Sequence, residues 1–493
     1  MIDLDKKSLE KIGFFNVLDS MCISTVFGHS LIYNLKQITD INTLSTEYDN
    51  VEKCITKVRN DKFYNNFTDL LGRFRDIRNT FTKCSLGEVL DEVELYEIKN
   101  FTLLSMELKQ IYENSNLLLT GITLFDLSAV YKKLNPHKSE TNSFYIYNDY
   151  SQFLIKVRIK KASIDKLLFK EKDLNKQKEL LRERASMINE EKSEEFKIRK
   201  MLSSEILKYT EKLLDFTSNI GKLDILFSKA KLAIDYDMCR PIARSKNTIR
   251  MKNGVHPIIK NEVTKRGGIF YPISIEVSLG SSVITGANMG GKTVILSVIA
   301  LNCILASLGF FSFAETFEFF PFDFIYFLYE DSVSPQTGLS SFGSEIVQVK
   351  KALEKLKYEN GILLIDEFAR GTNPVEGSNL TKALVSYLNK FSSVSVLTTH
   401  YDGVCTLAKK HYQVKGLKNI DFTALKISYT SDENYLKIIN NLMDYTLEKM
   451  DKNAVVPRDA LNICSLIGID SEIIKIAEKM YTGRQKNEKQ TES

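Results

Sequence analysis

The sequence contains no tryptophan, only eight prolines among its 493 residues, and no Cys-x-x-Cys pair. Its seven cysteines are scattered and odd in number, which argues against a disulfide framework or a zinc site and favours a reducing cytoplasm as its location. The first 15 residues include acidic side chains and no sustained apolar run, so we expect no signal peptide. A net charge of +5 is too small to indicate nucleic-acid binding by itself.

The scarcity of proline and glycine favours helices in the first half of the chain. From Leu9 to about Phe125 apolar residues recur every three or four positions, which predicts an all-α region. Residues 149–234 contain no proline and a single glycine, Gly221. Within them a seven-residue spacing predicts an apolar seam on long helices, with a break near 188–195. The expected seam residues are Leu167, Leu174, Leu181 and Ile188.

The same helical stretch carries an excess of basic residues. Residues 156–200 contain 15 Lys or Arg against 9 Asp or Glu. Two interpretations remain open: a solvated helix face, or a surface that contacts the phosphates of a nucleic-acid backbone.

The composition changes near Cys239. From there to about Leu425 short β-rich runs alternate with helical segments, a pattern that predicts a mostly parallel sheet covered by helices on both faces. The segment after Pro457 has the periodicity of amphipathic helices, and residues 484–493 are expected to be disordered.

One stretch, from Thr293 to Ala314, has no charged residue and is long enough to cross a bilayer. It follows a strand-like run and the pattern G-x-x-x-x-G-K-[ST], whose backbone N–H groups surround phosphates at the start of a helix. This position predicts a buried helix behind a phosphate loop and no membrane span, with Gly309 as its stop. The ATP-binding loop residues are Gly286, Ala287, Asn288, Met289, Gly290, Gly291, Lys292 and Thr293.

A second motif completes the expected ATP site. Lys292 would contact the β- and γ-phosphates, and the Thr293 hydroxyl would ligate Mg²⁺. The apolar run 361–365 ends in Asp366 and Glu367, which suits Mg²⁺ binding by Asp366 and activation of the attacking water by Glu367. The plain alternative is a strand that happens to end in acidic residues.

Two further elements point to a composite site. The segment Gly338-Leu-Ser-Ser-Phe-Gly-Ser-Glu-Ile346 resembles an ABC-type signature loop, in which a serine and backbone N–H groups contact a γ-phosphate bound by a second subunit. His400, at the end of a strand-like run, would sense that γ-phosphate. The alternative for His400 is a structural histidine.

Together these motifs resemble the MutS family of ATPases. The family patterns TG-x-N-x-GGK-[ST], G-x-S-T-F, DE-x-x-x-GT and THY are similar here to segments that begin at Thr285, Gly338, Asp366 and Thr399. The resemblance implies an α/β P-loop (ABC-type) ATPase domain preceded by an all-α core with lever helices. It also implies ATP and Mg²⁺ as ligands and a homodimer that borrows Ser340 and Gly338 from the partner. The expected domains are a helical core (1–148), lever helices forming a rudimentary clamp (149–238), the ATPase domain with C-terminal dimerisation helices (239–483) and a tail (484–493).

Departures from the mismatch-repair pattern are also present. Those members carry an N-terminal domain with a Phe-x-Glu wedge, whereas core-like helices begin here at about residue 8. The two Phe-x-Glu matches, at Phe169 and Phe313, lie in unsuitable contexts. Residues 371–377 resemble instead the second MutS subfamily, linked to recombination suppression or stalled-ribosome rescue. That subfamily usually ends in a nuclease domain, and we recognise none here.

Three functions are therefore considered. The first is an ATPase that closes around DNA or structured RNA, with phosphate contacts from Lys156, Arg158, Lys160 and Lys161. The second is a protein-remodelling ATPase similar to the reactivases of cobalamin-dependent aminomutases of the lysine 5,6-aminomutase type. The third, a scaffold that binds ATP without hydrolysing it, is disfavoured because Lys292, Asp366 and Glu367 are all present.

Overall fold

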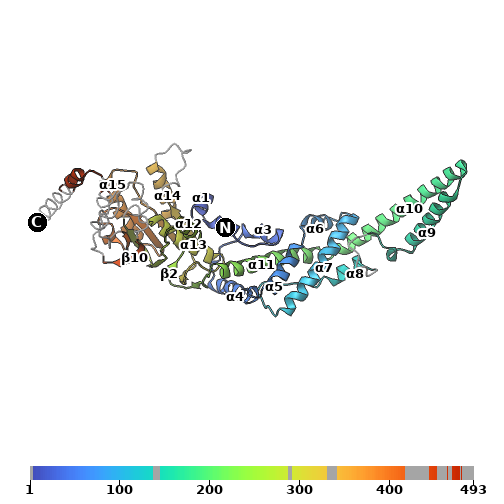
Figure 1. Cartoon of the computed structure of the whole chain (residues 1–493), viewed down its shortest axis with the longest axis horizontal. Coiled ribbons are helices and arrows are strands. Elements are labelled where there is room, and N and C mark those ends of the chain that lie inside the picture. The colour runs from blue at the N-terminus through green and yellow to red at the C-terminus, as the bar shows by residue number, and fades with distance from the viewer. Residues whose placement is uncertain are drawn as a thin grey trace. The chain divides into compact units, whose positions relative to one another are not determined.

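The structure is a computed structural model, shown in Figure 1. It describes residues 4–136, 145–286, 291–329, 341–416, 444–451, 464, 469–477 and 479. The chain divides into two compact units. One, the α/β unit, comprises Met1–Met21, Leu35–Val51 and Lys231–Ser493; the other, the helical unit, comprises Cys22–Asn34 and Glu52–Ala230. Helices α4 (Ile41–Val58) and α11 (Thr210–Asp235) contribute residues to both.

The helical unit is built from helices alone in its described part, as the apolar periodicity predicts. Its longest early helix, α7, begins with a capping box in which Asp91 accepts the Glu94 N–H and Glu94 reaches back to the Asp91 N–H. Phe101 on α7 packs edge-on against Phe74 and Phe81 at ring distances of 5.4 and 5.3 Å. The elements that lie wholly within this unit are α3 (Val26–Ile32), α5 (Asp61–Gly72), α6 (Arg78–Ser85), α7 (Glu92–Asn114), α8 (Ser128–Leu134), η1 (Asn148–Tyr150), α9 (Gln152–Lys170) and α10 (Leu174–Leu207).

Helices α9 and α10 form an antiparallel hairpin whose turn differs from the sequence prediction. The chain reverses at 171–173, not at 188–195, because Asp173 caps α10 by accepting the N–H groups of Asn175 and Lys176. The predicted break near 188–195 is wrong, since these residues lie inside an unbroken helix whose Glu191 and Glu195 bind Arg158 of α9.

The predicted seam of the hairpin is wrong as well. The buried contacts between α9 and α10 come from Val157, Ile164 and Met187, with Leu168 and Leu180 packed against them. Leu167, Leu174 and Leu181 are 54%, 74% and 54% exposed. A shift by one residue turns a helix by about 100°, so the neighbouring positions face the partner helix and keep the seven-residue spacing.

A six-stranded sheet forms the centre of the α/β unit, in the order β10-β9-β4-β8-β7-β6. Every pairing is parallel except that of β10 with β9, so the expectation of a mostly parallel sheet is confirmed. Strands β4, β7 and β8 are buried along their whole length, which explains their continuous apolar character. The strands are β4 (Gly280–Thr285), β6 (Phe324–Leu328), β7 (Gly361–Ile365), β8 (Val394–Thr399), β9 (Lys410–Gly416) and β10 (Asp444–Met450).

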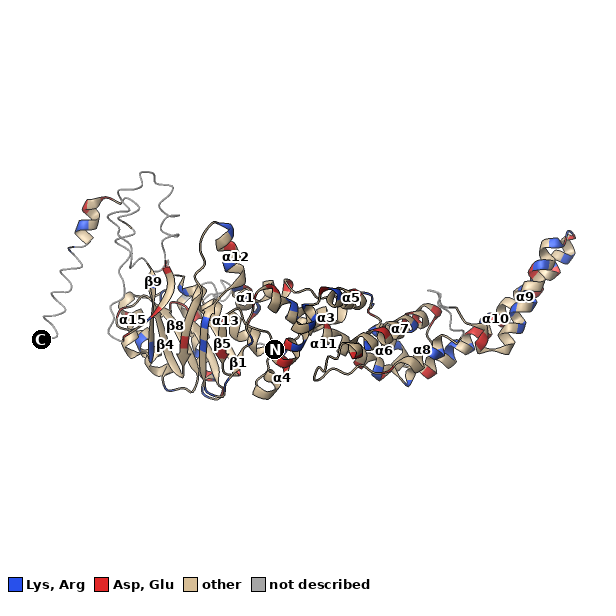
Figure 2. Cartoon of the chain, turned by 60° about the horizontal axis from the view of Figure 1, so that its bottom comes forward, with Lys and Arg blue, Asp and Glu red and all other residues tan. Residues whose placement is uncertain are grey.

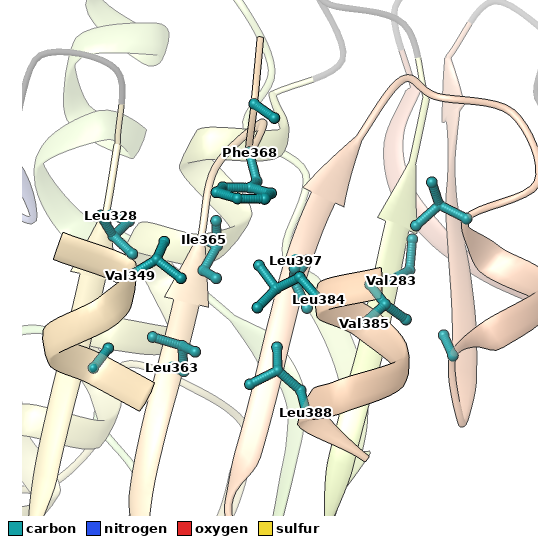
Figure 3. Close-up of a cluster of buried hydrophobic side chains, with 14 of the residues drawn as sticks. Val283, Leu328, Val349, Leu363, Ile365, Phe368, Leu384, Val385, Leu388 and Leu397 are labelled. Atoms are coloured by element: carbon teal, nitrogen blue, oxygen red, sulfur yellow. The ribbon is translucent and has the colours of Figure 1, made fainter. Parts of the chain in front are cut away.

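Two helices cover one face of this sheet. Leu384 and Leu388 of α15 (Pro374–Leu388) and Val349 of α14 (Ser341–Lys355) pack onto Ile365 of β7 and Leu397 of β8 in one buried cluster (Figure 3). This packing holds the ends of β7 and β8 in place.

Helix α13 (Lys292–Ser307) is the apolar helix that follows the phosphate-loop motif. It is 16 residues long and buried from Ile295 to Ser307. The Tyr48 hydroxyl donates to the Ala306 carbonyl at 2.7 Å, and the Ile38 N–H donates to the Ser307 carbonyl at 2.8 Å. The carbonyl groups at the end of the helix therefore have hydrogen-bond partners inside the protein. Gly309 has a φ of 76°, as expected for a helix stop. Within the described ranges no helix is long and apolar enough to span a membrane.

A second sheet, which the sequence pattern did not predict, has the order β1-β5-β2-β3. Strand β2 pairs antiparallel with β3 and β5, and β1 pairs parallel with β5. Its strands are β1 (Ile242–Ala243), β2 (Thr248–Gly254), β3 (Ile273–Ser278) and β5 (Thr316–Phe319). The remaining elements of this unit are α1 (Lys6–Lys11), α2 (Phe14–Asp19), α12 (Pro257–Lys265) and η4 (Cys405–Leu407).

Candidate nucleotide site

Three neighbouring strands deliver the candidate site residues to one edge of the large sheet. Strands β4, β8 and β7 lie side by side and parallel, so their carboxyl ends meet at the same edge. The phosphate-loop motif follows β4, His400 follows β8, and Asp366 with Glu367 follows β7. In open parallel sheets this edge is where ligands bind.

Lys292 is the first residue of α13 and its side chain is only 3% exposed. Its Nζ atom donates to the Gly286 carbonyl at 2.8 Å and lies 3.0 Å from Glu367 Oε1. The preceding residue, Gly291, has a φ of 67°, and a Cβ there would lie 2.9 Å from the ring of Tyr445. The close approach of this ring and the left-handed backbone both require glycine at this position.

Asp366 is held between two threonine hydroxyls. Its Oδ2 accepts from Thr293 Oγ1 at 2.5 Å and its Oδ1 from Thr398 Oγ1 at 2.6 Å. The Thr398 hydroxyl oxygen also accepts the Glu367 N–H at 3.0 Å, which ties β8 to the end of β7. The adjacent hydroxyl and carboxylate oxygens of Thr293 and Asp366 are the donors that a hard cation such as Mg²⁺ prefers.

Glu367 lies at the centre of a charged cluster and is 12% exposed. Besides Lys292, it faces Arg370 Nη1 at 3.3 Å and His400 Nδ1 at 3.9 Å. Its φ of 49° is left-handed, a strained conformation for a residue with a side chain, which is characteristic of functional sites. Burial lowers the pKa of His400 and outweighs the opposing effect of Glu367, so His400 is neutral near pH 7.

Ala369, two residues after Glu367, is held by two side chains distant in sequence. Its N–H donates to Glu345 Oε1 of α14 at 3.1 Å, and its carbonyl accepts from the Tyr401 hydroxyl at 2.9 Å. Ala369 also has a positive φ, of 61°. Burial raises the pKa of Glu345. We call Glu345, Ala369 and Tyr401 the latch, since they join α14 and the end of β8 to the segment that carries Glu367.

The latch needs a glycine beside it. A Cβ on Gly377 would lie 2.5 Å from the Tyr401 hydroxyl and 2.7 Å from the Ala369 carbonyl. The sequence motifs alone indicated no role for Glu345, Tyr401, Thr398 or Gly377. Glu345 and Tyr401 lie within the motif segments that begin at Gly338 and Thr399, and Gly377 is the last residue of the segment 371–377. Their position within or next to the motifs is the signal by which they could have been found.

The structure brings Gly286, Gly291, Lys292, Thr293, Asp366, Glu367 and His400 to this one edge. The other predicted site residues, Ala287, Asn288, Met289, Gly290, Gly338 and Ser340, lie outside the described residues.

The family described as MutS domain V matches residues 282–483, the region that contains all of these residues. This part of the chain is therefore similar in sequence to MutS domain V. Outside the matched residues lie the whole helical unit and the first strands of the α/β unit.

The similarity to known proteins extends beyond that domain. It is 26% identical over 474 residues to "Endonuclease MutS2" of Caldanaerobacter subterraneus subsp. tengcongensis, covering 84% of this chain and 58% of that protein. It is 30% identical over 234 residues to "Endonuclease MutS2" of Halothermothrix orenii, covering 46% of this chain and 28% of that protein. It is 31% identical over 226 residues to "DNA mismatch repair protein MutS" of Carboxydothermus hydrogenoformans, covering 45% of this chain and 26% of that protein. The chain therefore spans less than two thirds of the length of these relatives.

Proposed function

We propose that this protein is a Mg²⁺-dependent ATP hydrolase of the MutS type. The observation that carries the proposal is the 3.0 Å contact of Lys292 with Glu367, directly beside the Thr293–Asp366 pair. Phosphoryl transfer requires charges that this sheet edge supplies. They are a buried lysine, a glutamate with a strained backbone, and two oxygen ligands suited to Mg²⁺.

The roles follow from the contacts of each side chain. Lys292 at the start of α13 would bind the β- and γ-phosphate oxygens, helped by the free N–H groups of the helix. Thr293 and Asp366 would hold Mg²⁺, which would neutralise phosphate charge. Once Lys292 bonds to phosphate, Glu367 would be released to accept a proton from the attacking water, and neutral His400 would donate a hydrogen bond to the γ-phosphate.

Replacement of Glu367 by glutamine tests this assignment. Glu367→Gln keeps the size of the side chain and removes its basicity, so ATP binding should persist while phosphate release falls by at least about 100-fold. ATP binding is measured by equilibrium dialysis and turnover by steady-state phosphate release. Glu354→Gln, at a 58% exposed position on α14, is the control and should leave both unchanged. Full turnover by Glu367→Gln would refute the role of Glu367.

The site is proposed to be completed by a second copy of the chain through Ser340 and Gly338. The test mixes two inactive variants, Lys292→Ala and Ser340→Ala. A homodimer with shared sites would regain about a quarter of the wild-type rate, because half of the dimers would be mixed and each would contain one intact site. A monomer, or a site formed by one chain, would regain nothing.

The client is proposed to be DNA, which the ATP state would grip or release through clamp-like movement of the lever helices α9 and α10. The support is the similarity to relatives named "DNA mismatch repair protein MutS" and "Endonuclease MutS2". Of the four basic residues expected to contact phosphates, Arg158 and Lys161 are engaged by Glu191 and Glu195. Lys156 and Lys160 are exposed and remain the candidates.

Titration of the protein with branched DNA at rising salt tests this client. DNA binding through phosphates should weaken steeply with salt and should weaken further in a Lys156→Ala, Lys160→Ala double variant. Absence of binding at about 50 mM salt would refute it. No observation favours the alternative of an aminomutase reactivase; recovery of such an enzyme with the nucleotide-bound protein in a pull-down would support it.

A further inference from the structure

A pocket of about 400 Å³ opens in the helical unit, within the size range of small-molecule sites. It lies between the segment that joins α5 to α6 and helix α7, outside the residues that match MutS domain V. Its lining combines polar side chains with four apolar ones. The lining residues are Gly72, Arg73, Phe74, Arg75, Ile77, Tyr96, Glu97, Asn100, Phe101 and Leu104.

Three of the polar lining residues have no partner among the residues that the structure describes. The side chains of Arg75, Tyr96 and Asn100 make no hydrogen bond or ion pair with any residue that the structure describes. All three can donate hydrogen bonds: a guanidinium fork, a phenol and a primary amide. Convergence of unpartnered donors on one pocket favours a ligand with acceptor oxygens.

The other charged lining residues are engaged. Arg73 Nη1 pairs with Glu107 at 3.3 Å, and Glu97 Oε2 accepts from the Thr80 hydroxyl at 3.2 Å. Among the described lining residues Arg75 is therefore the one cation without a partner, and a single guanidinium charge favours a ligand with one oxyanion.

The apolar part of the lining is rigid. Phe74, Ile77, Phe101 and Leu104 are each less than 5% exposed, and Phe101 is fixed edge-on against Phe74. A small apolar or aromatic body could lie against this surface while its charged end reaches Arg75 and Asn100.

We propose that this pocket binds a small organic molecule that carries one oxyanion, either a carboxylate or a phosphodiester. Arg75 binds the oxyanion through its two-pronged guanidinium, Asn100 and Tyr96 donate additional hydrogen bonds, and the apolar floor holds the body of the ligand. The site does not depend on the ATP site, so each proposal can fail without the other.

Isothermal titration calorimetry on the full chain tests the pocket, with ADP and Mg²⁺ at saturation to occupy the ATP site. The probes are benzoate for a carboxylate, methyl phenyl phosphate for a phosphodiester, and benzamide as an uncharged analogue of benzoate. One of the two anions should bind with a Kd below about 1 mM, and benzamide should not bind. Whichever anion binds identifies the oxyanion class.

The same titrations on variants test whether the measured heat of binding comes from this pocket. Arg75→Ala and Asn100→Asp should each weaken the anion at least about tenfold, and Arg75→Lys should weaken it less because the charge remains. Arg59→Ala is the matched control, an exposed arginine of the same unit outside the pocket, and should bind like the wild type. The proposal is overturned if neither anion binds, if benzamide binds as well as benzoate, or if Arg75→Ala and Asn100→Asp bind like the wild type.

Discussion

Two groups of ion pairs have different surroundings: those at the edge of the parallel sheet and those in the α9–α10 hairpin. At the sheet edge, Lys292 and Glu367 pair in a buried position, and the backbone of Glu367 is strained. In the hairpin, Arg158 binds Glu191 and Glu195 and also donates to the Ile146 carbonyl at 2.8 Å. Figure 2 shows charges of both signs interspersed along α9 and α10.

The difference distinguishes charges that we propose to bind a ligand from charges that hold two helices together. Arg158 has two partners on α10 and two in the segment before α9, so the protein itself satisfies its donors. Lys292 and Glu367 meet at the ends of two parallel strands, where a ligand can take the place of either partner. Strain that the surrounding structure maintains is characteristic of functional sites.

The largest effect is expected for Lys292→Ala. It removes the buried charge that would meet the phosphates, so ATP hydrolysis should fall by at least about 100-fold and ATP affinity should also fall. Phosphate release and equilibrium dialysis measure the two quantities. Lys260→Ala, a change on α12 outside the site, should alter neither. Hydrolysis within threefold of the wild-type rate would remove the distinction between the two kinds of ion pair.

A smaller effect is expected for Gly377→Ala, which tests whether the latch positions Glu367. The added Cβ would press on the Tyr401 hydroxyl and the Ala369 carbonyl, so the latch must shift. We expect a loss of about 1–3 kcal/mol in unfolding free energy and a fall in kcat without an equal change in KM for ATP.

The control for this change is Gly72→Ala. An added Cβ there has open space within the α5 helix, so the variant should be as stable as the wild type or slightly more stable. Urea unfolding and steady-state kinetics on both variants make the comparison. If Gly377→Ala kept wild-type kcat and stability, the latch would have no role in positioning Glu367.

The sequence predicted the local parts of the molecule and missed the long-range ones. The buried helix after the phosphate-loop motif and the acidic end of β7 are set by residues adjacent in the chain. The latch depends on Glu345, Ala369 and Tyr401, which meet only through tertiary packing. The hairpin turn was misplaced because the apolar spacing of seven continues through it, whereas the cap at Asp173 determines where α10 begins. The small sheet was missed because β1 and β5 are short and distant in sequence.

A third prediction concerns the hairpin itself. Arg158→Ala leaves Glu191 and Glu195 without their arginine, so the unfolding free energy should fall by about 1–3 kcal/mol, which urea unfolding would measure. Lys160→Ala, an exposed position on the same helix, should change stability by less than about 0.5 kcal/mol. In DNA titrations, by contrast, Lys160→Ala should lose more DNA affinity than Arg158→Ala. A stability loss that is equal in the two variants would mean that Arg158 does not fasten the hairpin.

The smallest effect is expected for an exposed ion-pair network in the helical unit. Hydrogen bonds from Lys133 and Lys208 lower the pKa of Glu205 to about 2. A folded-state pKa below the unfolded value of 4.5 means that Glu205 contributes stability above about pH 4.5, which is lost as the pH falls toward 2. Glu205→Gln should therefore be slightly less stable than the wild type at pH 7 and equal to it near pH 2. Glu179→Gln, also on α10 but without such partners among the described residues, is the control and should be as stable as the wild type at pH 7. Because the network lies at the surface, with Lys133 38% and Lys208 63% exposed, the difference should also shrink in high salt, unlike the effect of Arg158→Ala.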